Sequence, residues 1–130
     1  MVFTNTALAN IGDGSGLQPS ATAGSLYVAL YTVAPSDAGG GTECTYTGYG
    51  RVAVARSGAG WTVASGVAEN AAAVTFGACT AGSETAVAFS IMTAASSGDM
   101  LFWGDLTANL NISAGITPEF AAGELTITED

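Results

Sequence analysis

The segment SLYVALYTV, residues 25–33, decides the fold class of this chain, because it is an extended run with apolar side chains on both faces. Side chains alternate sides along a strand, so Leu26 and Leu30 share one face while Tyr27 and Tyr31 share the other. Such a strand is either central and covered twice, or covered once and in contact with a partner. Both alternatives predict a β-protein, and the second makes Tyr27 and Tyr31 candidate interface residues.

Further short segments rich in valine, threonine and aromatic residues follow, separated by glycine-containing turns. Runs of this length and composition are typical of strands. We therefore predict an all-β fold, a β-sandwich or jelly roll of about eight short strands, forming a single domain over residues 1–130. Beyond residues 25–33, the predicted strands are 49–57, 60–67, 73–77, 85–92, 100–108, 110–113 and 124–128.

The residues before the first strand are predicted to form one short helix and a connecting arm, residues 1–24, with the sandwich occupying residues 25–130. Phe3, Leu8 and Ile11 fall on one side of such a helix. An apolar helix face outside the sandwich is a candidate contact with a partner protein, so all three are predicted interface residues.

The charge balance limits the possible functions. The chain of 130 residues has two arginines, no lysine and no histidine against eleven carboxylates, a formal charge of −9. It cannot neutralise a row of phosphates, so nucleic acid is not an expected partner, and neither is a membrane surface. Histidine-based triads and lysine nucleophiles are excluded by composition. We expect no enzyme activity, no cofactor and no metal site.

Both basic residues lie in GYGRVAVAR, residues 48–56. Arg51 and Arg56 have opposite parity in a strand, so they project to opposite faces and cannot form one basic patch. One interpretation is that both are solvated. The other is that Arg51 holds a carboxylate or loop carbonyls with its planar fork and ties the long loop 34–48 to the sheet. Arg56 would then be free to meet an acidic neighbour across an interface.

The two cysteines and the segment MLFWGDL supply further candidate residues. Cys44 and Cys79 show no metal-binding spacing, and we expect both thiols to be reduced, with Cys79 a buried structural residue. The segment MLFWGDL is predicted to place Leu101 and Trp103 on the face opposite Phe102. One sandwich buries one face of such a strand, so Leu101 and Trp103 are predicted interface residues.

The order of motifs along the chain resembles that of a group of small bacteriophage virion proteins, some described as putative tail fibre proteins and some as capsid decoration (cement) proteins. The resemblance covers roughly residues 4–128. The motifs that carry it are NTALANI (5–11), SLYVALYT (25–32), APSDAGGGTE (34–43), YGRVAV (49–54), LFWGDL (101–106) and TPEFAAGELTIT (117–128).

This resemblance implies a virion structural protein that is made in the host cytoplasm. The chain is short and has no coiled-coil or β-helical repeat to form a shaft. We therefore expect a capsid decoration protein on the capsid exterior, a homotrimer bound to the major capsid protein. The alternative is a tail fibre or receptor-binding module that recognises a host glycan.

Overall fold

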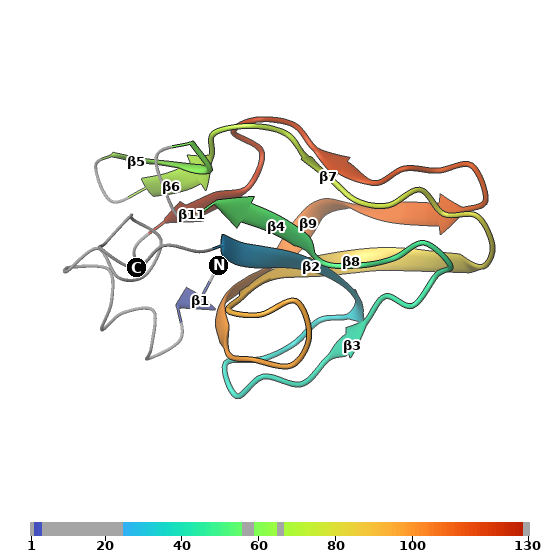
Figure 1. Ribbon diagram of the computed structural model, residues 1–130. Helices are drawn as coiled ribbons and strands as arrows, with labels where there is room; N and C mark the ends of the chain where they lie inside the picture. The colour runs from blue at the N-terminus through green and yellow to red at the C-terminus, as the bar shows by residue number, and fades with distance from the viewer. Residues whose placement is uncertain (1, 4–24, 56–58, 65–66, 129–130) are drawn as a thin grey trace.

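The computed structural model describes residues 2–3, 25–55, 59–64 and 67–128, and every regular element within these ranges is a strand (Figure 1). A helix long and apolar enough to cross a membrane is not found in them. The all-β prediction is therefore confirmed. The strands are β1 (Val2–Phe3), β2 (Ser25–Val33), β3 (Thr42–Glu43), β4 (Val52–Ala55), β5 (Trp61–Ala64), β6 (Val67–Asn70), β7 (Val74–Thr75), β8 (Ser83–Met92), β9 (Met100–Ser113), β10 (Glu119–Phe120) and β11 (Thr126–Thr128).

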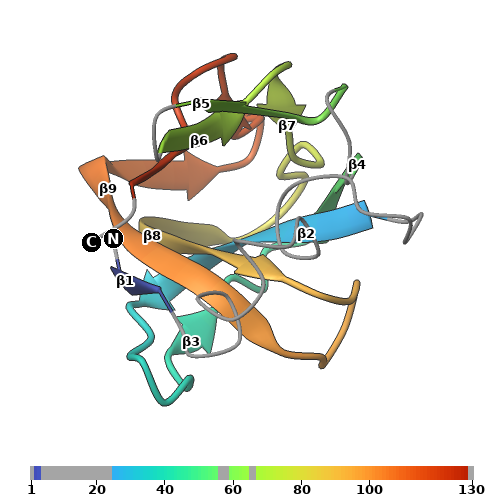
Figure 2. The ribbon, with the colours of Figure 1, turned by 90° about the vertical axis from the view of Figure 1, so that its left-hand side faces the viewer.

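Strand β2, the segment with two apolar faces, lies inside the largest sheet. The order of that sheet is β1-β9-β8-β2-β3, and β4 shares an edge of β2 with β3. All pairings are antiparallel, and β8 lies along the other edge of β2. Figure 2 shows β2, β8 and β9 as neighbouring strands of one twisted sheet. Of the two alternatives for this strand, the central position is the one that the structure adopts.

The main core lies between this large sheet and two smaller antiparallel sheets, β10-β7 and β11-β6-β5 (Figures 1 and 2). All three sheets contribute fully buried side chains, among them Phe102 from β9, Val74 from β7 and Trp61 from β5. Leu26 and Leu30 of β2 point into this core and are at most 1% exposed.

The opposite face of β2 is covered as well. Ala29 and Tyr31 join Ala88 and Met92 of β8 in a second, smaller buried cluster, against which Tyr27 packs partly buried. The apolar residues on the two faces of β2 therefore pack into two separate buried clusters of the same chain.

Two predicted strand boundaries are wrong. The segment 60–67 is not one strand: it holds β5 and the first residue of β6, and these two strands pair antiparallel with Ala64 opposite Val67. The segments 100–108 and 110–113 are one strand, β9, because both pair with β8. Two paired strands that follow one another so closely, and a strand that continues across polar residues, give weak periodicity signals in a sequence.

The predicted N-terminal helix lies outside the described residues except at Phe3, and the placement of Phe3 on a helix face is wrong. Phe3 belongs to β1 and lies opposite Phe102 of β9. A residue in a β ladder has extended backbone dihedral angles and cannot also begin a helix. Leu8 and Ile11 lie outside the described residues.

The long loop 34–48 is ordered by local pairing. It contains β3 and a tight turn in which Ser36 and Gly39 exchange backbone hydrogen bonds of 3.0 and 2.8 Å. Gly41 has a φ of +77°, and a Cβ added there would lie 2.7 Å from the carbonyl oxygen of Val33. Only glycine fits a left-handed backbone at such a close approach.

Candidate functional site

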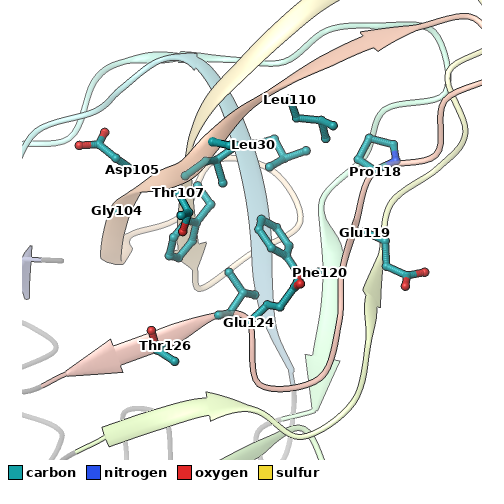
Figure 3. A pocket seen from close by; sticks show the side chains of 14 residues that line it. Leu30, Gly104, Asp105, Thr107, Leu110, Pro118, Glu119, Phe120, Glu124 and Thr126 are labelled. Atoms are coloured by element: carbon teal, nitrogen blue, oxygen red, sulfur yellow. The ribbon is translucent and has the colours of Figure 1, made fainter.

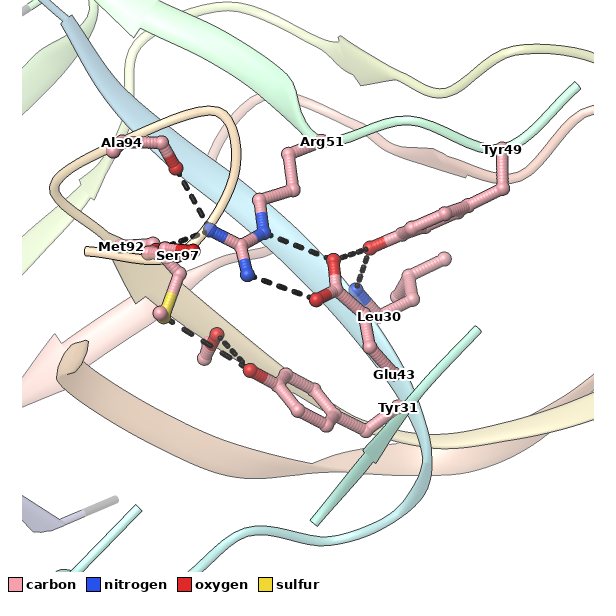
Figure 4. Close-up of polar contacts among 9 residues, drawn as sticks. Leu30, Tyr31, Glu43, Tyr49, Arg51, Met92, Ala94 and Ser97 are labelled. Atoms are coloured by element: carbon pink, nitrogen blue, oxygen red, sulfur yellow. Dashed lines mark hydrogen bonds and ion pairs between the residues drawn. The ribbon is translucent and has the colours of Figure 1, made fainter. Parts of the chain in front are cut away.

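Arg51 joins three parts of the chain (Figure 4). Its Nε and Nη2 donate to the two carboxylate oxygens of Glu43 in β3, both at 2.9 Å. Its Nη1 donates to the carbonyl oxygens of Ala94 and Ser97, at 2.8 and 2.9 Å, in the loop between β8 and β9. The bidentate contact predicted for Arg51 is thus present, and it does tie the 34–48 loop to the rest of the sheet. We call these residues, with Tyr49, the Arg51 clamp.

Electrostatics favour the ionised forms of Glu43 and Arg51 within the clamp. Burial by itself would raise the pKa of Glu43, but hydrogen bonds from Arg51 and Tyr49 and the positive charge of Arg51 outweigh it, so this pKa lies below its usual range. Burial and the hydrogen bond to Glu43 raise the pKa of Tyr49. The Tyr49 hydroxyl also accepts a hydrogen bond from the backbone N–H of Leu30 in β2, at 3.2 Å. The clamp therefore reaches the central strand of the sheet.

A second carboxylate, that of Glu84, holds the part of the 34–48 loop that follows β3. Glu84 of β8 accepts hydrogen bonds from the backbone N–H groups of Thr45 and Tyr46 and from the Thr45 hydroxyl, at 2.9–3.1 Å. Nearby Cys44 is buried, and burial together with the Glu84 charge raises the pKa of its thiol to about 12. Cys44 is therefore an unreactive core residue.

A pocket opens beside the main core, between β9 and the segment that carries β10 and β11 (Figure 3). Its volume is about 580 Å³. Its upper wall comes from an irregularity in β9: Ala86 of β8 pairs with Leu110 and Ala88 with Asp105, so β9 advances five residues while β8 advances two. The surplus residues bend away from β8. This bend forms one side of the pocket.

The pocket has an apolar floor and a polar rim. Leu30, Phe89 and Leu125 belong to the buried core and form the floor, and Phe120 lies half-buried among them. The rings of Phe120 and Phe89 form a T-shaped pair, with centroids 5.9 Å apart. In Figure 3 the Phe120 ring stands in the middle of the lining side chains. The polar lining residues, all exposed, are Asp105, Thr107, Glu119, Glu124 and Thr126.

The three rim carboxylates have few partners among the described residues. Glu119 accepts a hydrogen bond from Thr75 Oγ1 and Glu124 one from the Ala121 backbone N–H, both at 2.9 Å. The described ranges contain one ion pair, Arg51–Glu43, so no described cation neutralises the rim. Nor do those ranges hold a cluster of three or more side chains able to bind a metal ion.

Among the described residues, the predicted interface residues Tyr27, Tyr31, Leu101 and Trp103 do not form one exposed surface. Tyr31 is only 5% exposed, and its hydroxyl accepts from Ser90 Oγ at 3.0 Å and contacts Met92 Sδ at 3.9 Å (Figure 4). Tyr27, on the same face, is partly buried. Arg56 lies outside the described residues. Tyr31 is therefore a residue of the smaller core and does not form part of the protein's surface.

The expectation for Leu101 fails in the same way. Ile91 lies opposite Phe102 and Met92 opposite Met100, so Leu101 is an extra residue on β9, a β-bulge. The bulge breaks the strict alternation, and Leu101 and Phe102 both enter the main core, at 2% and 0% exposure. Trp103 is partly buried, and its Nε1 donates to Asp37 Oδ1 at 3.0 Å. Trp103 thereby holds the tip of the 34–41 loop against β9.

Cys79 is buried in the main core, as expected of a structural residue, and its thiol is free, as is that of Cys44. The Cys79 Sγ lies 3.3 Å from the carbonyl oxygen of Ala81. That distance fits a weak thiol hydrogen bond inside an apolar environment.

A family model described as Podophage GP4 fiber I protein gp80 matches residues 5–128 of the chain. The chain belongs to this family. No curated protein matches the chain. Membership of the gp80 family makes this a virion protein of the fibre type, which confirms the phage resemblance inferred from the motifs.

The sequence of this gp80-family chain points to the residues of the Arg51 clamp more clearly than to those of the pocket. An arginine in a chain with only two basic residues is a candidate for a specific carboxylate contact, although nothing in the sequence singles out Glu43 among eleven carboxylates. The pocket residues come from β2, β8, β9 and the C-terminal segment, and no local pattern connects them. The one available signal is the short run Thr107–Asn109, which interrupts the apolar pattern between Leu106 and Leu110.

Proposed function

We propose that this chain is a structural component of a phage tail fibre, acting as a binding module and not as an enzyme. The observation that carries the proposal is the match of a fibre-protein family model to residues 5–128, nearly the whole chain. The absence of lysine and histidine supports it, because most nucleophilic and general-base mechanisms need one of them.

The architecture suits such a role. Both cysteines are free, and the Arg51 clamp ties the 34–48 loop to the sheet, so this loop is held without a disulfide. A rigid domain can present a concave site without a large entropic cost on binding. We propose further that the module acts as a homo-oligomer, with a trimer the simplest form, since closed symmetry multiplies weak sites.

Capsid decoration, the sequence-based expectation, has less support, because the family description names a fibre. The expected partnership with the major capsid protein becomes one outcome of the test. That test is an electron cryomicroscopy reconstruction of the particle, with antibody fragments bound to this chain. Labels on the tail fibres support the proposal. Labels arrayed over the shell, with bare fibres, refute it and restore the decoration role.

A further inference from the structure

We propose that the pocket beside β9 binds a saccharide unit that carries no negative charge. The proposal rests on the proposed function for the source of the ligand, the outer surface of a bacterial host. The structure supplies the ligand chemistry through three observations: the cavity, its apolar floor with one aromatic ring, and a rim that offers hydrogen-bond acceptors.

The size of the cavity fits a small ligand. Its volume of about 580 Å³ lies within the range usual for small-molecule sites, roughly 300–1,000 Å³. Its walls come from strands of the sandwich, β2, β8 and β9, and from the segment 118–126. Sites built on paired strands hold their geometry, so this pocket is preformed.

The floor selects a ligand with an apolar face. Phe120 presents its ring among the lining residues (Figure 3), and the ring is held by edge contacts with Phe76 and Phe89, with centroids 6.1 and 5.9 Å apart. The face of an aromatic ring is electron-rich and attracts weakly positive C–H groups. A sugar ring has such a face, and its other edge carries hydroxyl groups.

The rim selects hydroxyl donors. The carboxylates of Asp105, Glu119 and Glu124 are acceptors only, and Thr107 and Thr126 add hydroxyl groups that accept or donate. Glu119 and Glu124 each use one carboxylate oxygen in a hydrogen bond within the chain and keep the other for a ligand. A polyhydroxylated ligand satisfies several acceptors at once.

The same rim rejects acidic ligands. Three carboxylates surround the cavity, no described cation lies among its lining residues, and the whole chain carries −9. A uronic acid, a sialic acid or a sugar phosphate would place like charges within a few ångströms, which opposes binding. Neutral sugars are therefore accepted, and amine-bearing sugars are favoured further by charge.

The test uses the purified full-length chain and oligosaccharide probes in three charge classes. The neutral probes are maltotriose, lactose, rhamnose and tri-N-acetylchitotriose. Chitosan trimer carries amines, and sialyllactose and trigalacturonate carry acids. Binding is followed by backbone amide NMR shifts. We expect neutral or amine-bearing probes to shift amides of residues 104–110 and 119–126, and acidic probes to cause no such shifts.

Matched variants separate the pocket from the rest of the surface. Asp105→Asn and Thr126→Val change exposed rim residues and leave the core intact. We expect Asp105→Asn to weaken a neutral probe by about tenfold, the loss typical of one hydrogen bond to a charged group. Asp99→Asn makes the same charge change on the exposed loop before β9 and is expected to leave affinity unchanged.

The outcomes distinguish this inference from the proposed function. If no neutral or amine-bearing probe shifts the pocket amides, or if acidic probes bind best, the inference is overturned even when particles show the chain on the fibres. Equal loss in Asp105→Asn and Asp99→Asn also overturns it, because the effect would then be one of net charge. Pocket binding by a chain that is located on the shell supports the inference and refutes the fibre role.

Discussion

Replacing Arg51 by lysine tests whether the Arg51 clamp stabilises the domain. Arginine donates four hydrogen bonds here, two to Glu43 and two to the carbonyl oxygens of Ala94 and Ser97. Lysine keeps the charge but has no planar fork, so it can satisfy one of these groups of acceptors and not all of them. Arg51→Lys therefore removes about half of the contacts while it keeps the net charge.

The magnitude follows from the burial of the pair. A hydrogen bond to a charged group contributes about 1.5–3 kcal/mol when it is well buried. The side chains of Arg51 and Glu43 are 9% and 27% exposed, so solvent screening moves the value to the low end of that range. Loss of two such bonds gives about 3 kcal/mol, which lowers the melting temperature of a domain of this size by roughly 9–12 °C.

The assay is thermal unfolding followed by circular dichroism at pH 7 for the wild type, Arg51→Lys, Glu43→Gln and the double variant. The cycle isolates the coupling between the two side chains, which we expect to exceed about 1 kcal/mol. A melting temperature within about 2 °C of the wild type for Arg51→Lys, or a coupling near zero, would show that the clamp is a solvated contact that does not stabilise the fold.

Three further predictions follow from the described contacts. The pKa of the Glu43 carboxyl is lower in the folded chain than in the unfolded chain, so the stability that Glu43 confers is complete above the ordinary glutamate pKa of about 4.3 and is lost as the pH falls through the folded pKa. The melting temperature of Glu43→Gln should therefore fall less steeply than that of the wild type between about pH 5 and pH 3. Because the thiol pKa of Cys44 is raised to about 12, iodoacetamide at pH 8 should leave it unlabelled in the folded chain, whereas denaturation without reductant should give two labelled cysteines by mass; none labelled would contradict the free thiols. Gly40→Ala and Gly41→Ala share a left-handed backbone, but only Gly41 lacks space for a Cβ, so its variant should melt at a lower temperature than Gly40→Ala, and equal melting temperatures would argue against the close approach.

The sequence predicts those parts of the fold whose periodicity is regular. Residues 25–33 and 85–92 correspond closely to β2 and β8, because long apolar runs leave little choice of structure. The interface predictions for Leu101 and Tyr31 failed because alternation alone cannot reveal a β-bulge or a second core. Both depend on which strands pair, and that information is spread over the whole chain.

The same limit applies to the site. Arg51 could be chosen from composition alone, since it is one of two cations, but its partners Ala94 and Ser97 contribute backbone carbonyls, which carry no sequence signal. The pocket depends on the surplus residues of β9 after Asp105, and an irregular register is a property of the paired strands.

The Arg51 clamp also has a consequence for how long the folded domain lasts. Arg51 is 43 and 46 residues away from Ala94 and Ser97 in sequence, so we expect these contacts to form after β2 and β8 have paired. Contacts that close late are absent from the folding transition state, and they act on the rate of unfolding and leave the rate of folding unchanged. The clamp therefore lengthens the lifetime of the native state, the property that matters for a particle that waits outside a cell with no means of replacing a subunit.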